Sequence, residues 1–342
     1  MKTEKNLHQF ALLTAIATFF LIIAGGLVTS TQSGLSVPDW PLSYGQLMPP
    51  MVGGILYEHG HRMVATFVGF LTTILAILLW KREERKWVRN LGLIALGAII
   101  AQGVLGGLTV LFLLPTPISV SHATLAQSFF AIIASIALFT SEWWKSNQPL
   151  LKHDSRTPHI ATLAVFTTGA IFIQLILGAL MRHTNSGLAV PDFPLAYGQI
   201  FPSVSPDAMA RYNDQLIRND YRIFADDPLT ASQVLVHMIH RVWAVVVTVM
   251  VLWTAFRLSK LSGISKRLSR FSYAFVALVC IQISLGAFTV LSRKSVDITT
   301  AHVVTGALLL VTSVLTTLNA FKLYGIQIPR LAVHVKTTGV IA

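Results

Sequence analysis

Long apolar stretches recur along this chain of 342 residues and constrain its fold more than any other feature. Each is close to the roughly 20 residues that an α-helix needs to cross the hydrocarbon core of a bilayer. They are residues 10–29, 60–80, 91–112, 120–140, 160–181, 235–256, 271–291 and 300–321. None shows the short alternating pattern that is typical of a membrane β-barrel. We therefore predict an all-α integral membrane protein with eight transmembrane helices.

Charged residues are sparse and collect between alternate apolar stretches. Only 12% of the residues are charged, yet the formal net charge is +12. Most Lys and Arg residues lie near the two termini and in residues 81–89, 145–156 and 257–270. With eight spans these segments share one side of the membrane, which the positive-inside rule assigns to the cytoplasm. We expect a protein of the cell inner (cytoplasmic) membrane with both termini cytoplasmic, whose charge serves topology and lipid contact and does not indicate nucleic-acid binding.

Two proline-rich segments indicate an internal duplication. GLSVPDWPLSYGQLMP at residues 34–49 and GLAVPDFPLAYGQIFP at residues 187–202 are identical at 11 of 16 positions. Because proline lacks a backbone donor and fixes φ, we expect structured loops over the outer ends of the helices. Four spans in each half, an even number, would insert both halves in the same orientation as a parallel repeat. We predict two four-helix bundles, residues 1–150 and 151–342, with an insertion at about residues 203–232.

Four histidines recur at matching places in the two halves. His61 and His122 are 61 residues apart and His240 and His302 are 62 residues apart, each near the outer end of an even-numbered span. Polar side chains inside a membrane are costly and are retained mostly where function requires them. Zinc usually takes four ligands with thiolates or carboxylates among them, whereas a heme iron takes one or two imidazoles and an apolar crevice. We predict one heme site in each half, both close to the outer face.

Two further positions bear on these sites. Arg62 and Arg241 each follow a predicted ligand, where a guanidinium suits either a heme propionate or the outer lipid headgroups. Three residues before the histidine, the first half has Glu58 and the second has His237. Residues i and i+3 share a helix face, so we expect Glu58 to face the pocket of His61. Its carboxylate suits proton transfer, and a charge that only stabilises the helix end is the alternative.

These features together resemble the heme A synthase family over nearly the whole chain. The E-x-x-H-R motif, the GLSVPDWPL loop, the duplicated halves and the four histidines carry the resemblance. It implies oxidation of the ring D methyl group of heme O to a formyl group, which makes heme A for terminal cytochrome oxidase. It also implies that His240 and His302 hold a heme B cofactor. The substrate heme O would lie between His61 and His122, with Glu58 as the catalytic residue.

The first outer loop departs from the pattern of that family. Many bacterial members have a cysteine pair there, and the corresponding positions in this chain are Val37 and Ser43. A disulfide in this loop is therefore excluded. His59 and His237 suit either a partner of the ligands or polar residues at the water boundary.

Two other classes of protein would also explain the paired histidines. One is a diheme b-type membrane electron carrier, which leaves unexplained why Glu58 occurs in one half alone. The other is a heme-binding assembly protein without catalysis. As partners we expect the lipid bilayer, a heme O synthase and an electron-transfer protein. A homo-oligomer is compatible with the sequence.

Overall fold

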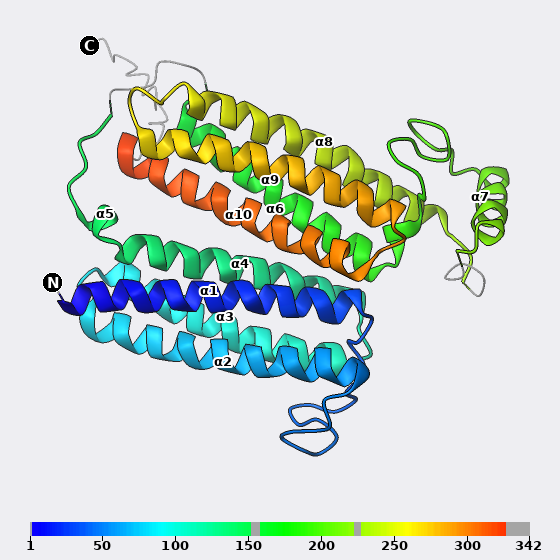
Figure 1. The fold of residues 1–342 in the computed structure, drawn as a ribbon, viewed down its shortest axis with the longest axis horizontal. Helices are drawn as coiled ribbons and strands as arrows, with labels where there is room; N and C mark the ends of the chain where they lie inside the picture. Colours follow the sequence, from blue (N-terminus) through cyan, green and yellow to red (C-terminus); the bar gives the residue numbers. More distant parts are fainter. Residues whose placement is uncertain (1, 152–157, 222–226, 326–342) are drawn as a thin grey trace, which may run out of the picture.

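The computed structural model describes residues 2–151, 158–221 and 227–325, and within them it is all-helical (Figure 1). Eight helices are long and apolar enough to cross a membrane, as predicted: α1 (Lys2–Ser30), α2 (Gly53–Arg82), α3 (Lys86–Leu111), α4 (Thr116–Thr140), α6 (Ile160–His183), α8 (Ala231–Ser259), α9 (Lys266–Leu291) and α10 (Val296–Tyr324). Three shorter elements are α5 (Glu142–Lys145), the 3-10 helix η1 (Ser186–Leu188) and α7 (Pro206–Arg218). The protein is therefore a multi-pass membrane protein.

Several of these helices begin before the apolar stretches that predicted them. Helix α2 starts at Gly53, seven residues ahead of the stretch at 60–80, and so includes Glu58 and His59. Both side chains are buried and hydrogen-bonded to the preceding loop. Polar residues in the first turns of a helix are acceptable where they find such partners, which hydropathy alone does not reveal.

Local capping signals set the start of α8, the helix that carries His240. The Thr230 hydroxyl accepts the backbone N–H of Gln233, and the Gln233 side chain accepts the backbone N–H of Thr230. This reciprocal capping box satisfies two of the donors that a helix N-terminus leaves free. The cap therefore fixes where the helix begins, two and a half turns before the histidine.

The eight spans lie in two groups of four (Figure 1). We call α1 to α4 the N-terminal group, and α6, α8, α9 and α10 the C-terminal group. Each has its own apolar core, around Phe129 and Ile133 in the first and around Phe275 and Val251 in the second. Helices α4 and α10 are the most enclosed, with 61% and 50% of their apolar windows buried against 17% for α9. They therefore lie at the centre, where the two groups pack together.

Both long connections lie at the same end of the helices (Figure 1). Residues 31–52 join α1 to α2, and residues 184–230 join α6 to α8. The second connection includes α7, whose Tyr212 and Leu216 are buried in a small apolar cluster with the loop. The insertion predicted at residues 203–232 thus holds a helix that packs on the loop.

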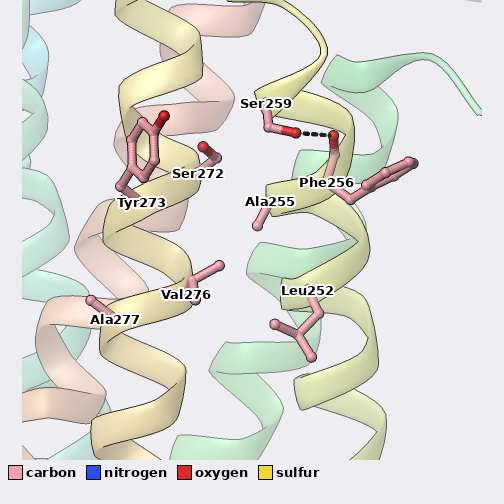
Figure 2. Close-up of a pocket in the computed structure, with 8 residues that line it drawn as sticks. All are labelled: Leu252, Ala255, Phe256, Ser259, Ser272, Tyr273, Val276 and Ala277. Atoms are coloured by element: carbon pink, nitrogen blue, oxygen red, sulfur yellow. Dashed lines mark hydrogen bonds between the residues drawn. The ribbon is translucent and has the colours of Figure 1, made fainter.

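An apolar groove between α8 and α9 lies toward the other end of the helices (Figure 2). Leu252, Phe256, Tyr273 and Val276 are among its lining residues. The Ser259 hydroxyl donates to the Phe256 carbonyl at 2.8 Å. The groove holds none of the predicted site residues, so the candidate site lies elsewhere.

Candidate functional site

The four predicted histidines all lie in the first three turns of their helices, at the end of the molecule that carries the long loops. His61 is on α2 and His122 on α4, and the two are close enough to interact electrostatically. His240 on α8 and His302 on α10 form a second such pair. The structure therefore brings the histidines together as one pair in each group.

Every one of these imidazoles lies against a glycine of a neighbouring helix. A Cβ atom added to that glycine would lie 3.1 to 3.3 Å from Cε1 of the ring, closer than ordinary van der Waals contact. The pairs are Gly25 with His61, Gly106 with His122, Gly178 with His240, and Gly286 with His302. The glycines therefore let each ring approach a helix backbone, which a larger residue would prevent.

Three of the histidines have a ring nitrogen without a partner. The Nδ1 atoms of His61, His122 and His302 are buried and make no hydrogen bond to any residue that the structure describes. Such groups are uncommon in native proteins, and they indicate a site arranged for a further group rather than for packing alone. Within the described residues no cluster of three or more His, Cys, Asp or Glu could hold a bare metal ion. Paired imidazoles and glycine-lined walls fit a heme, which needs only one or two axial ligands and a flat space.

A glutamine four residues before the glycine approaches three of the four histidines. In each case its Oε1 is buried without a partner while its Nε2 contacts the histidine. The contacts are Gln102 to the His122 carbonyl at 3.0 Å, Gln174 to the His240 carbonyl at 3.1 Å, and Gln282 to Nε2 of His302 at 3.4 Å. The matching residue of α1 is Leu21, so His61 lacks this support.

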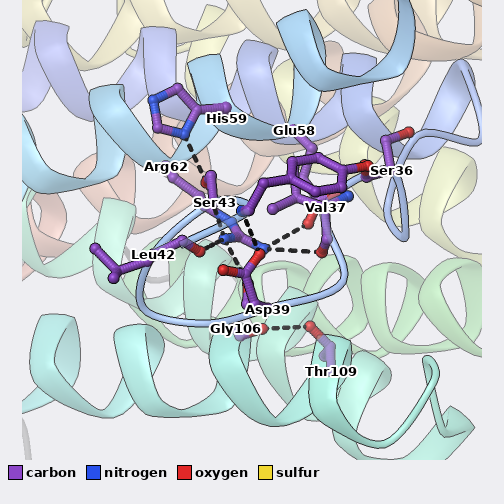
Figure 3. Close-up of polar contacts among 11 residues, drawn as sticks. Ser36, Val37, Asp39, Leu42, Ser43, Glu58, His59, Arg62, Gly106 and Thr109 are labelled. Atoms are coloured by element: carbon purple, nitrogen blue, oxygen red, sulfur yellow. Dashed lines mark hydrogen bonds and ion pairs between the residues drawn. The ribbon is translucent and has the colours of Figure 1, made fainter. Parts of the chain in front are cut away.

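The arginine that follows the histidine in each copy binds the preceding outer loop to its helix, as Figure 3 shows for Arg62. Arg62 donates to the backbone carbonyls of Val37, Asp39 and Leu42 at 3.3, 2.8 and 2.9 Å. Arg241 donates in the same way to the carbonyls of Val190, Asp192 and Leu195. These bonds explain why the sequence places an arginine after the histidine in both copies. Contact with a heme propionate, which the sequence also suggests for both, stays a prediction.

An aspartate closes each loop from within. The two Asp39 oxygens accept the backbone N–H groups of Tyr44 and Gly45 at 2.6 and 2.8 Å. These hydrogen bonds, most strongly the one from Gly45, lower the pKa of Asp39 below its ordinary value. Asp192 makes the same pair of bonds in the second loop. The Pro-Asp-aromatic-Pro segments are therefore structured loops, as their sequence predicts.

Glu58 connects the first loop to α2. Its side chain is buried, with Oε2 accepting the Val37 N–H at 2.8 Å and Oε1 accepting Arg62 at 2.7 Å. In the second copy His237 takes this place, with Nδ1 bonded to the Ser186 carbonyl at 2.9 Å. Burying a carboxylate is tolerable because it is paired and hydrogen-bonded. The ion pair thus places the one carboxylate of the E-x-x-H-R motif between the loop and the helix that carries His61.

The sequence analysis left His59 unassigned, and the structure gives it a partner. Its Nδ1 lies 2.8 Å from the Ser43 hydroxyl, which also accepts Arg62 at 3.3 Å (Figure 3). Glu58, Arg62, Ser43 and His59 therefore form one continuous network. The second copy has Ala196 and Met238 at the positions of Ser43 and His59. That joint difference between the copies was the sequence signal for the contact.

Fold and site together define a multi-pass membrane protein with a pair of inward-lying histidines in each of two helix groups. A sequence profile of the family described as "Cytochrome oxidase assembly protein" matches residues 8–54 and 51–314. The chain belongs to this family.

Curated relatives carry a more specific name. The heme A synthase of Halalkalibacterium halodurans is 34% identical over 220 residues, which is 61% of this chain and 70% of the relative. The heme A synthase of Shouchella clausii is 30% identical over 60% of this chain and 69% of its own length. That of Bacillus pumilus is 30% identical over 64% of this chain and 70% of its own length.

Proposed function

We propose that this protein is a heme A synthase, which oxidises the ring D methyl group of heme O to a formyl group. The family match over most of the chain carries the proposal, and the name shared by the curated relatives specifies it. The four glycine-backed histidines support it independently, since they suit two hemes. The enzyme thereby supplies heme A to terminal cytochrome oxidase.

The two helix groups take different roles in this proposal. His61 and His122 bind the substrate heme O in the N-terminal group, residues 1–150. His240 and His302 hold a heme B cofactor in the C-terminal group, residues 151–342. Heme B, when bound, supplies one-electron redox chemistry. The different surroundings of the two histidine pairs support the division of labour, because only the first pair has a carboxylate in its E-x-x-H-R motif.

Glu58 is the proposed catalytic residue. Conversion of a methyl to a formyl group removes hydrogen atoms as protons and electrons while one oxygen atom is added. A carboxylate can accept a proton or stabilise positive charge at the methyl carbon, and the Val37 N–H and Arg62 hold the two oxygens of Glu58 in a fixed orientation. Arg62 donates both to Oε1 of Glu58 and to the Ser43 hydroxyl, and that hydroxyl contacts Nδ1 of His59. This chain of hydrogen bonds connects Glu58 to the outer loop.

The distribution of charged residues supports a proposal for the membrane and the orientation of the protein. We place the protein in the cell inner (cytoplasmic) membrane, with both termini cytoplasmic and the heme sites near the outer face. The basic segments between α2 and α3 and between α8 and α9 support this orientation through the positive-inside rule. A heme O synthase that delivers the substrate and an electron-transfer protein are the proposed partners, and a homo-oligomer is the proposed assembly.

Heme extraction tests the function directly. The protein is expressed with a heme O synthase in cells that lack heme A, purified, and its extracted hemes are identified by mass spectrometry. We expect heme A and heme B. Two hemes B and no heme A would identify a diheme electron carrier, unmodified heme O would identify a binding protein without catalysis, and absence of any heme absorption would reject all three.

A further inference from the structure

Two cationic side chains lie at the outer end of the C-terminal group, and the described part of the chain gives neither an acidic partner. Arg182 is in the last turn of α6, and Lys294 is in the turn between α9 and α10. Both are partly buried, and neither forms an ion pair within the described residues. The hydrogen bond of Arg182 goes to the Ser30 hydroxyl of α1 at 3.2 Å. A hydroxyl does not neutralise a partly buried guanidinium, so no described residue compensates the charge of Arg182.

These two cations are close to one another and to a predicted heme ligand. Burial lowers the pKa of Lys294, and the neighbouring Arg182 lowers it further. Arg182 and Thr300 of α10 donate to the same Ser30 hydroxyl, at 3.2 and 3.0 Å, and Thr300 lies two residues before His302, with which Arg182 interacts electrostatically. Two positive charges that crowd together beside an apolar site favour an anion between them.

The same turn exists in the N-terminal group with apolar side chains. Lys294 corresponds to Leu114, and both residues have a left-handed backbone, with φ of 67° and 59°. The Lys294 side chain lies 3.7 Å from the Cβ position of Gly187, and that of Leu114 lies 3.6 Å from the Cβ position of Gly34. Because the backbone and the packing are alike, the lysine is not required to form the turn.

The repeat places Thr29 where the C-terminal group has Arg182. Both cations therefore belong to the C-terminal group alone. The arginine that the two copies share is not equivalent to them, because in the C-terminal group all three side-chain nitrogens of Arg241 are bonded to His237 and to loop carbonyls.

We propose that Arg182 and Lys294 bind the propionate carboxylates of the heme held between His240 and His302. This inference rests on the proposed function and adds an anion site to it. A guanidinium and an ammonium form charge-assisted hydrogen bonds to carboxylates, about twice as strong as neutral ones. The N-terminal group, which must release its product, has a threonine and a leucine instead. The cations thus distinguish a heme that is retained from one that is exchanged.

The test compares R182Q/K294Q with the wild-type protein, both purified with their resident heme. Two variables are measured: the rate at which heme passes to excess apomyoglobin, and the midpoint potential of the heme. Loss of two charge-assisted bonds should raise the dissociation rate by about 10- to 100-fold. The potential should fall, because positive charge near the iron favours the reduced state. R182K/K294R keeps both charges, so its dissociation rate and midpoint potential should be close to those of the wild type.

A matched control removes a charge from the same turn. Arg293 is exposed, donates to the Asn219 carbonyl at 3.1 Å and lies over the Tyr221 ring. R293Q should therefore change neither the dissociation rate nor the potential. Reconstitution with heme dimethyl ester, which lacks the propionate charges, should make R182Q/K294Q and wild type lose heme at similar rates.

Three results would overturn the inference. Unchanged heme retention and potential in R182Q/K294Q, with heme present in the wild type, would refute the propionate site and leave the proposed function standing. Loss of bound phospholipid phosphorus in that variant, with heme retention unchanged, would assign the cations to a lipid phosphate. A wild-type protein that binds no heme would refute the proposed function and this site together.

Discussion

The two helix groups share a scaffold and differ at a few positions within it. In both, an arginine after the histidine binds three loop carbonyls, an aspartate closes the loop, and glycines back the histidines. Apart from the insertion that holds α7, side chains around that scaffold differ, among them Glu58 against His237 and Leu21 against Gln174. The two copies thus keep the contacts that hold the loop and the histidines, and the proposed difference in chemistry falls on the few positions that changed.

The remaining differences have the same character. Ser43 and His59 form a buried contact in the first copy, whereas Arg182 and Lys294 place positive charge only in the second. The N-terminal group therefore has polar groups arranged around a carboxylate, and the C-terminal group has two neighbouring cations, one of which interacts electrostatically with His302. This contrast is what the following substitutions test.

The largest effect is expected from the histidines themselves. H240A and H302A should abolish retention of the resident heme, because each removes an axial ligand. H61A and H122A should retain that heme and lose heme A formation. Heme content per protein and mass identification of the product measure the two outcomes. If H61A strips the resident heme as completely as H302A, the assignment of separate roles is wrong.

Next in size is Glu58. E58Q should keep heme B and lower the rate of heme A formation by about 100-fold or more, the usual range for a lost acid or base. Glu83 provides a matched control, since it is likewise buried and paired, with Arg85 at 2.8 Å, at the opposite end of α2. E83Q should leave the rate unchanged. Normal product formation by E58Q would remove Glu58 from the mechanism.

A smaller effect is expected from the glycines. In G106A the new Cβ would lie 3.3 Å from Cε1 of His122, so the ring must move, at a cost of about 1 to 3 kcal/mol. We expect roughly tenfold weaker binding of the substrate, measured by optical titration with heme O. Gly103, one turn away, has nothing within 4 Å of its Cβ position, and G103A should bind normally. Equal effects of the two changes would show that general helix packing, not the ring contact, is responsible.

The smallest effect concerns the buried contact between the first loop and α2. S43A gives the first loop the alanine that the second loop has naturally at Ala196. It leaves Nδ1 of His59 without its partner, at a cost of about 1 to 2 kcal/mol. Amide hydrogen exchange of residues 31–52 should accelerate accordingly. A196S should not slow exchange in the second loop, because Met238 stands at the position of His59 there and offers no matching hydrogen-bond partner. Unchanged exchange in S43A would mean that the contact between Ser43 and His59 does not stabilise the first loop.

Much of the fold could be predicted because hydropathy is a local property. A helix that crosses a membrane must be apolar along its length, and all eight spans follow from that requirement. The start of α2 at Gly53 could not be predicted in this way, since Glu58 and His59 are acceptable there only through their bonds to the loop. Arg62 shows the same limit: its position was evident, but its binding to three loop carbonyls depends on how the loop folds back.

By itself the sequence determined the eight helices, the duplication and the four candidate ligands, because apolar length and repeated motifs are properties of the chain. Tertiary structure alone decided which glycine lies against which histidine ring and which buried polar atoms lack a partner among the described residues. It also brought Arg182 of α6 and Lys294 of the α9–α10 turn, more than 100 residues apart in the sequence, close enough to interact electrostatically. Such contacts join helices that only packing brings together, and the energetic cost of a buried charge or an unpaired nitrogen depends on its surroundings.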